Sequence, residues 1–335
     1  MNNLKKIGLS ALAGSLVAVS ANAGELSVSG SAEYTYTDNN GSTGSGNNIT
    51  GNPWGAQQLV VFTGSGDVGF GELTVVRAQN DGGTANSTSY STLDMGDAGK
   101  LSFDSNGYGG VGYAANDDIL PTAYEEIWTG TSASGVSGAG SNNTLGYANS
   151  YGPVSFSVGY QKDGPSANQS ESSASGAGVT GSTTDYYVSL AVPMVEGLTI
   201  GAGYAESTQN SAATTDADTN YIGGNVNYTM GSVSIGYRSS QANKGTANTA
   251  SEKTTGFGIA FNVNENFAVS YGEQTTERDA IAATTTTVDE EVTGINASYT
   301  MGAASIRLLN SVSDNDGFVA NTEKEHTEIS VVLSF

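Results

Sequence analysis

The sequence of 335 residues has no cysteine, one histidine and only 11 basic residues against 33 acidic ones. The lack of cysteine excludes disulfide frameworks, thiolate metal sites and thiol catalysis. The excess of negative charge disfavours nucleic acid as a partner and favours cations. After residue 23 no apolar run approaches the roughly 20 residues of a spanning helix, which excludes a helical inner-membrane protein. Such a chain crosses a bilayer only with strands.

The first 23 residues have the pattern of a secretory signal peptide. Lys5 and Lys6 form a short basic start, residues 7–19 form an apolar stretch, and 21–23 are a small-x-small cleavage site. The apolar stretch is shorter than a spanning helix needs, so a membrane anchor is the weaker alternative. Cleavage after residue 23 removes two lysines and no acid, which leaves nine basic and 33 acidic residues, a net charge near −24.

Apolar and polar residues alternate along most of the remaining chain, which predicts strands. The last strand shows this clearly, because Ile329, Val331, Leu333 and the C-terminal Phe335 share one face. The pattern predicts about sixteen strands, most of them close to the roughly 9 to 11 residues of a tilted membrane strand. They are 25–37, 56–66, 69–79, 88–95, 99–104, 143–149, 153–162, 184–194, 197–206, 219–230, 231–240, 252–263, 265–275, 290–301, 302–313 and 324–335.

The connections between these strands alternate in length. The short set is 67–68, 96–98, 150–152, 195–196, 230–231, 264 and 301–302, and the long set is 38–55, 80–87, 105–142, 163–183, 207–218, 241–251, 276–289 and 314–323. Short periplasmic turns and long extracellular loops are the organisation of an outer-membrane β-barrel. We therefore predict an all-β fold for residues 24–335, a transmembrane antiparallel β-barrel.

The two faces of the predicted strands differ in a way that suits a membrane barrel. Large apolar residues alternate with small or polar ones, as in 197–206, or in 256–261, where Gly256 and Gly258 lie opposite Phe257 and Ile259. A soluble barrel or sandwich fills its interior with bulky apolar side chains, so this pattern predicts a small-residue face that borders water. Sixteen strands make an interior too wide for side chains to plug.

Four basic residues are candidates for the channel wall. Arg238 and Arg307 lie opposite apolar neighbours and are predicted to point inward, and Lys100 alternates with apolar residues and is predicted to face water. Arg77 shares the parity of apolar neighbours, but a lipid-facing charge costs roughly 2 to 4 kcal/mol near the midplane, which favours the lumen. The alternative for each is a solvated wall residue in an ordinary salt bridge.

The segment 105–142 is long, acidic and partly apolar. Loops of this length are usually functional or disordered. Its acidic residues are Asp117, Asp118, Glu125 and Glu126, and it has no lysine or arginine. Its middle contains Ile119, Leu120, Ile127 and Trp128. An extracellular flap does not need these apolar side chains, so we expect the middle to pack against another part of the protein.

Together the signal peptide, the sixteen strands, the acidic loop after the fifth strand and Phe335 resemble the general diffusion porins of Gram-negative bacteria. The stretch 95–103 followed by this loop is most similar to alphaproteobacterial porins, and the enterobacterial sequence Pro-Glu-Phe-Gly-Gly is absent. The resemblance implies that loop 105–142 folds into the barrel and narrows the pore. Its carboxylates Asp117, Asp118, Glu125 and Glu126 would then face Arg77, Lys100, Arg238 and Arg307. The few bases of this chain predict a weak transverse field. The resemblance also implies a homotrimer.

The predicted function is passive diffusion of small hydrophilic solutes and ions through an outer-membrane channel, with a preference for cations because acids outnumber bases. One alternative is a substrate-specific channel in which tyrosine and tryptophan side chains of the loop form a stacking track for sugars. Another is a surface β-barrel adhesin.

We predict no catalytic activity and no cofactor. A barrel enzyme needs a nucleophile and a base, and His326 with Glu328 on the same face has no placed serine partner. Calcium is the one metal that the sequence raises, because acid groups in outer loops offer oxygen ligands without the spacing of a known calcium loop. These groups are Asp216 with Asp218, Asp314 with Asp316, and Asp289 with Glu290 and Glu291.

Overall fold

The structure, a computed structural model, describes residues 24–41, 51–81, 86–106, 112, 116, 119–134, 144–163, 180–210, 218–244, 250–279 and 287–335. The signal peptide predicted for residues 1–23 lies outside the described residues. The strands are β1 (Glu25–Gly41), β2 (Trp54–Asp67), β3 (Glu72–Asn80), β4 (Asn86–Asp94), β5 (Lys100–Asn106), β6 (Thr144–Tyr151), β7 (Val154–Asp163), β8 (Thr180–Ala191), β9 (Leu198–Asn210), β10 (Thr219–Met230), β11 (Val233–Lys244), β12 (Glu252–Asn264), β13 (Phe267–Arg278), β14 (Glu290–Met301), β15 (Ala304–Asp314) and β16 (Glu323–Ser334). Two short 3-10 helices also lie within the described residues, η1 (Gly96–Ala98) and η3 (Asp316–Phe318).

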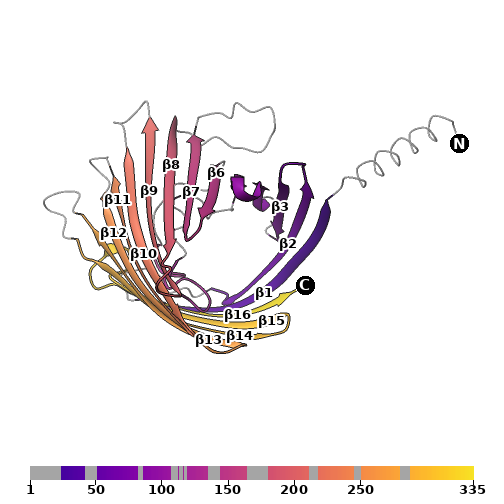
Figure 1. The fold of residues 1–335 in the computed structure, drawn as a ribbon. Helices are drawn as coiled ribbons and strands as arrows, with labels where there is room; N and C mark the ends of the chain where they lie inside the picture. Colours follow the sequence, from indigo (N-terminus) through magenta and orange to yellow (C-terminus); the bar gives the residue numbers. More distant parts are fainter. Residues whose placement is uncertain are drawn as a thin grey trace, which may run out of the picture.

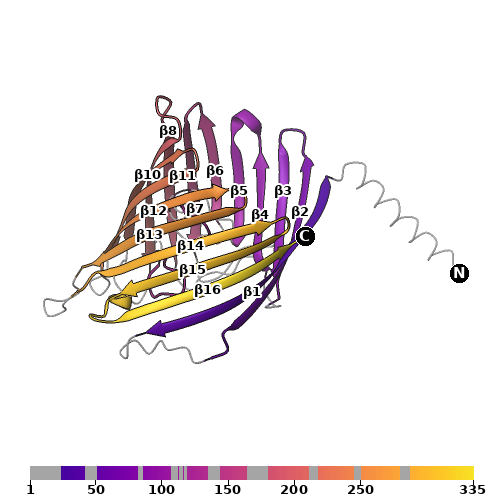
Figure 2. The same cartoon turned by 90° about the horizontal axis from the view of Figure 1, so that it is seen from below.

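The sixteen strands close into one antiparallel barrel. Each strand pairs with its neighbours in the sequence, and β1 pairs with β16 from Ser31 opposite Ser334 to Gly41 opposite Lys324. The wall runs from β1 through the middle strands and returns with β16 beside β1 (Figure 1 and Figure 2). The predicted fold class and strand number are therefore confirmed.

Strand ends differ from the predicted ends by a few residues, for physical reasons. The predicted strand 184–194 ends at Ala191 because Pro193, which has no backbone N–H, lies in the turn before β9. At two other short turns Gly231 and Gly302 have φ angles of 60° and 58°, which a residue without a Cβ adopts at little cost. Among the described residues no helix is long and apolar enough to cross a membrane.

The barrel is apolar outside. On β16 the side chains of Ile329, Val331 and Leu333 are exposed on the outer face, while Ser330 and His326 are buried on the inner face. The same alternation recurs on the other strands, where exposed Leu, Val, Ile, Phe and Tyr side chains share the outer face. An outer surface of this kind is stable against lipid tails rather than against water.

The join between the first and last strands reaches the final residue. Gly30 N donates to Phe335 O at 3.0 Å, and Phe335 N donates to Gly30 O at 2.9 Å. A Cβ on Gly30 would lie 2.6 Å from Cζ of the Phe335 ring and 2.5 Å from the backbone oxygen of Leu59. The aromatic end of the chain therefore fits against β1 only because residue 30 has no side chain.

We expect Gly30→Ala to destabilise the barrel by about 1 to 3 kcal/mol, the usual cost of overpacking. Gly64→Ala is the matched control, because Gly64 pairs with Leu26 and Val75 on the outer face and its Cβ would meet nothing within 4 Å. Urea unfolding of the refolded protein in detergent, followed by tryptophan fluorescence, compares the two. Equal unfolding midpoints for both variants would contradict this account of the join.

Candidate channel site

The described part of the predicted loop 105–142 lies against the inner wall of the barrel. Gly112 N donates to Ser157 Oγ on β7 at 2.8 Å, and Asn225 Nδ2 on β10 donates to Asn116 Oδ1 at 2.6 Å. Further along, Ala123 N donates to Ser270 Oγ on β13 at 2.9 Å. The described residues Gly112, Asn116 and Ala123 thus contact β7, β10 and β13 in turn. We call residues 119–134 the inner segment.

Glycines on the wall make room for the apolar side chains of the inner segment. Leu120 and Pro121 lie over Gly256 and Gly258 on β12, and Pro121 also lies over Gly236 on β11. Ile127 lies over Gly272 on β13 and Gly294 on β14, where an added Cβ would be 2.7 Å from the Cβ of Ile127. The prediction that Gly256 and Gly258 border water is therefore wrong, because these residues are small to admit the inner segment.

Near the middle of the inner segment, Glu125 lies close to two acidic side chains of the wall. Tyr124 Oη donates to Glu328 Oε1 on β16 at 2.7 Å and lies 3.3 Å from Glu33 Oε1 on β1. Ser330 Oγ also donates to Glu33. Glu125 is held by its backbone, since its N donates to Asn296 Oδ1 at 3.3 Å and its O accepts from Asn296 Nδ2 at 3.1 Å. Glu33 and Glu328 therefore meet at the Tyr124 hydroxyl, and the Glu125 carboxylate is near enough for their charges to act on it. We call Glu33, Glu125 and Glu328 the carboxylate cluster.

Burial and mutual repulsion change the acidity of this group. Burial raises the pKa of Glu125, and the carboxylates of Glu328 and Glu33 raise it further, while Arg307 and a hydrogen bond from Thr129 lower it. Burial and the hydrogen bond to Glu328 raise the pKa of Tyr124, so its hydroxyl stays protonated and can donate.

The two wall arginines that were predicted to point inward do so, and both lie against aromatic side chains of the inner segment. The Arg238 guanidinium carbon is 4.9 Å from the centre of the Trp128 ring, and that of Arg307 is 5.2 Å from the centre of the Tyr124 ring. Arg238 is fully buried, whereas Arg307 is partly exposed.

The other predicted site residues lie in different places. Lys100 forms an ion pair of 3.4 Å with Asp94, its cross-strand neighbour at the short-turn end of the barrel. Glu126 is half-buried and lines a small niche with Leu120 and Ile127. Asp117 and Asp118 lie outside the described residues.

The prediction that Arg77 faces the lumen is wrong. Arg77 is exposed on the outer face of β3, in one cross-strand row with Phe62 on β2 and Ser89 on β4. Side chains alternate strictly from Val75 to Arg77, with no bulge between them, so Arg77 points to the same outer face as Val75. The lipid cost that favoured the lumen does not override the alternation, because this part of the outer face carries other polar side chains.

Sequence reasoning did not assign Glu33, Gln274 and Asn296 to the site. Each lies on the inner face of its strand, and parity alone would have found that face: Glu33 alternates with the outward Tyr34 and Tyr36. Parity does not show which inward residues the inner segment reaches, because that depends on how far the segment extends along the wall.

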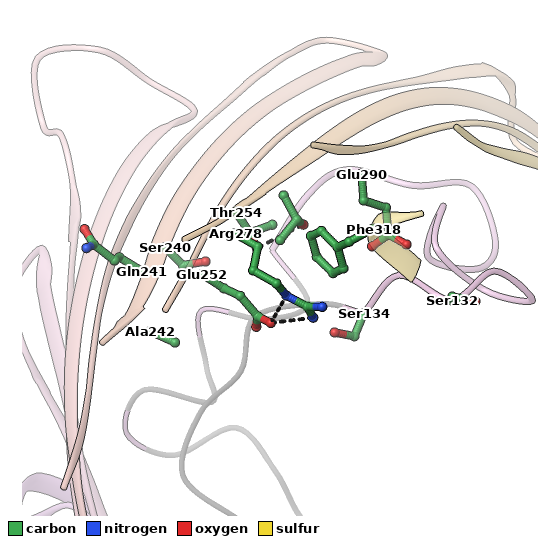
Figure 3. Close-up of a pocket in the computed structure, with 11 residues that line it drawn as sticks. Ser132, Ser134, Ser240, Gln241, Ala242, Glu252, Thr254, Arg278, Glu290 and Phe318 are labelled. Carbon is green, nitrogen blue, oxygen red and sulfur yellow. Dashed lines mark hydrogen bonds and ion pairs between the residues drawn. The ribbon is translucent and has the colours of Figure 1, made fainter. Parts of the chain in front are cut away.

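A polar niche of about 70 Å³ lies where the inner segment meets the outer ends of the strands. Figure 3 shows Arg278 between Glu252 and Phe318, with Ser134 and Glu290 nearby. Arg278 Nη2 is 2.7 Å from Glu252 Oε1, and its guanidinium carbon is 3.5 Å from the centre of the Phe318 ring. The niche therefore joins β12, β13 and η3 to the end of the inner segment.

Two of the acids that raised the question of calcium, Asp316 and Glu290, accept hydrogen bonds from the protein. Asp316 Oδ1 accepts from Ser132 N at 2.8 Å and Oδ2 from Ser132 Oγ at 2.6 Å, and Glu290 Oε1 accepts from Gly317 N at 2.6 Å. In the part of the chain that the structure describes, no three acidic or histidine side chains converge as a metal site. Asp216 lies outside that part.

A closed barrel with an apolar outer face, a polar inner face and a segment inside defines a transmembrane channel of the outer-membrane type. A family model described as "Gram-negative porin" matches residues 163–334, more than half of the chain. The chain therefore belongs to the Gram-negative porin family.

Solved structures of outer-membrane proteins share this fold. OmpT, an outer membrane protein of Vibrio cholerae, is 12% identical over 92% of this chain and 97% of its own, with a TM-score of 0.66. The anion-selective porin of Comamonas acidovorans is 13% identical over 93% of this chain and 99% of its own, with a TM-score of 0.64. OmpF of Salmonella typhi is 13% identical over 93% and 98%, with a TM-score of 0.65. At these identities the likeness shows the fold alone. Comparison with curated protein sequences gives no match.

Family and fold together establish an outer-membrane porin, which forms a water-filled channel for passive diffusion of small hydrophilic solutes. The more specific likeness to alphaproteobacterial porins stays a prediction.

We expect the raised pKa of Glu125 to give the channel a pH dependence. The charge on Glu125 is present above this pKa and is lost as the pH falls through it, so the permeability ratio of cations to anions should fall at a higher pH than an ordinary glutamate would give. Glu125→Gln should have a lower ratio at pH 7 and lack this step. Reversal potentials in a KCl gradient between pH 7 and pH 4 measure both. A titration of Glu125→Gln identical to that of the wild type would show that Glu125 does not act on ions.

Proposed function

We propose that this porin is a cation-selective channel and that the inner segment forms its narrowest section, as predicted for loop 105–142. The observation that carries the proposal is the carboxylate cluster, which joins the inner segment to β1 and β16 through the Tyr124 hydroxyl. Carboxylates grouped at a narrow point in a pore favour cations.

The basic residues near the inner segment offset this cluster only in part. Arg238 is buried beneath the inner segment, so Arg307 is the wall arginine of the two that keeps some exposure. Low-dielectric walls concentrate the field of the carboxylates in the opening. The Debye length is about 8 Å at physiological ionic strength, so we expect the preference for cations to weaken as salt rises.

The test is the reversal potential of single channels of residues 24–335, refolded and inserted into planar bilayers under a KCl gradient. We expect stepwise openings with a cation-selective potential, because the cluster concentrates cations in the opening. The triple variant Glu33→Gln, Glu125→Gln, Glu328→Gln should lose most of that selectivity.

Glu196→Gln is the matched control, since Glu196 is an exposed acid in the turn between β8 and β9. It should leave the potential unchanged. An unselective or anion-selective wild type would reject the proposed selectivity, and a triple variant as selective as the wild type would place the selectivity elsewhere in the channel.

A stacking track for sugars has less support than the open channel. The faces of Trp128 and Tyr124 lie against Arg238 and Arg307, so the same faces do not stack on a passing sugar ring.

The porin family and fold also support a channel without catalysis. His326 Nδ1 is 2.6 Å from Asn39 Oδ1, and its Nε2 is 3.7 Å from Glu328 Oε2. Both contacts are with neighbouring side chains of the barrel wall, as expected for a structural residue.

We further propose a homotrimer that buries the outer face of β2 to β4. This face carries Arg77 and Ser89 in one row and Ser91 beside Val75 in the next. An arginine facing lipid costs roughly 2 to 4 kcal/mol near the midplane, a cost that protein packing on this face avoids. Vibrio cholerae OmpT has a trimer form, which also supports the proposal.

We expect Arg77→Ala to weaken the trimer because it removes a polar contact of that interface. Lys162→Ala is the matched control, since Lys162 is an exposed base on β7, outside the proposed interface. Electrophoresis of unheated samples across a temperature series, with light scattering in detergent, measures the assembly. A monomeric wild type, or trimers of equal stability in both variants, would argue against this interface.

A further inference from the structure

Arg238 makes contacts that a residue facing the pore does not need. It is fully buried, its guanidinium lies 4.9 Å from the Trp128 ring, and its Nη2 donates to Gln274 Oε1 at 2.8 Å. Gln274 Nε2 in turn donates to Ser134 O at 2.9 Å. Arg238 therefore contacts the inner segment directly at Trp128 and through Gln274 at Ser134.

The neighbouring residues of the wall leave room for the Arg238 side chain to extend to Gln274. Arg238 on β11, Gly256 on β12 and Gln274 on β13 occupy one cross-strand row. Because Gly256 has no side chain, the guanidinium can pass over β12 to Gln274, with Leu120 above the same glycine. The arginine, the glycine and the glutamine form one support under the inner segment.

Arg307 makes the second contact of this kind. Its guanidinium lies over the ring of Tyr124, four residues before Trp128 in the sequence. Arg307 comes from β15, four strands along the wall from β11. The hydroxyl of the same tyrosine reaches Glu328 and Glu33. The inner segment is thus held at two aromatic rings by arginines from separate parts of the wall.

We propose that Arg238 and Arg307 are positioning residues: through their contacts with Trp128 and Tyr124 they fix the inner segment against the wall and so set the size of the opening. The inference rests on the proposed role of the inner segment as the narrowest section. It differs from the transverse field implied by the porin resemblance, in which wall bases act on passing ions.

Two substitutions separate the two roles. Arg238→Lys keeps the charge but loses the planar guanidinium group, which stacks on an aromatic ring while it donates hydrogen bonds. Trp128→Leu keeps every charge but loses the aromatic face. A field on ions predicts that both variants behave like the wild type. Positioning predicts that both loosen the inner segment in the same way.

The readout is the permeability of neutral sugars of increasing size, measured by liposome swelling with the refolded protein, because neutral sugars do not respond to a field on ions. We expect Arg238→Lys and Trp128→Leu each to raise the permeability of the larger sugars about two- to five-fold, as the loss of one cation–π contact implies. The double variant should be no more permeable to the larger sugars than either single variant, because both substitutions remove the same contact.

Arg307→Lys should also raise the permeability of the larger sugars. Tyr124→Phe, which keeps the ring, should raise it less than Arg307→Lys does.

Lys100→Met is the matched control, since Lys100 is a base on the inner face that pairs with Asp94. It should change the reversal potential in KCl without changing sugar permeability.

A disulfide can lock the inner segment to the wall, because the chain has no cysteine of its own. The pair Ala123→Cys and Ser270→Cys suits this purpose, since Ala123 N is 2.9 Å from Ser270 Oγ. Oxidation of that pair in the Trp128→Leu background should restore the sugar permeability of the wild type.

Unchanged sugar permeability in both Arg238→Lys and Trp128→Leu would overturn the positioning role, and so would a double variant whose effect is the sum of the two. Replacing residues 119–134 by a short Gly-Ser linker tests the proposed function separately. If the linker leaves sugar permeability unchanged, the inner segment is not the narrowest section and the proposed function itself fails. If the linker opens the channel but neither point variant does, only the positioning role fails.

Discussion

The constraint on which the structure depends is that a bilayer offers no hydrogen-bond partner for an unpaired backbone. The pairing of β1 with β16 meets this constraint, and it extends to the last residue through the two hydrogen bonds between Gly30 and Phe335. Closure leaves no free edge in the membrane, and it fixes which side chains face lipid and which face the lumen. The direction in which each side chain of the wall points follows from that alternation.

The inner face is organised around the inner segment as much as around water. Glycines under Leu120, Pro121 and Ile127 let the segment approach the wall closely, and wall arginines lie against its two aromatic rings. The contacts of the segment therefore come from glycine, aromatic and arginine side chains, while its carboxylates gather near β16 and β1. If the proposed function holds, the shape of the opening and its charge are carried by different residues.

The fold could be predicted from the sequence because period-2 alternation is strict in a two-faced strand. The last strand, with Ile329, Val331 and Leu333 outside and Ser330 inside, shows how directly the pattern gives the wall. The same rule places Arg77 outside, against the prediction from the cost of a charge in lipid. The outcome shows that alternation along a paired strand is a stronger guide to the direction of a side chain than the cost of its charge in lipid.

The site was harder to predict because it depends on contacts between distant parts of the chain. An inward arginine looks the same in the sequence whether it faces solutes or lies under Trp128. Gly256 looks the same whether it borders water or lies under Leu120, and Glu33 is more than 90 residues from its partner Tyr124. The apolar middle of loop 105–142 predicted packing against another part of the protein, but the alternation could not say which strands receive it.

The most direct test of the central claim is to place a cysteine at residue 125 of this cysteine-free chain and record single-channel current while thiol-reactive reagents are added. The account predicts that a cationic methanethiosulfonate reagent reacts faster than an anionic reagent of similar size, because the neighbouring carboxylates Glu33 and Glu328 concentrate cations, and that each modification lowers the current in a step. A residue 125 that does not react, or one whose modification leaves the current unchanged, would contradict the claim that the inner segment lines the narrowest, acidic section of an open channel.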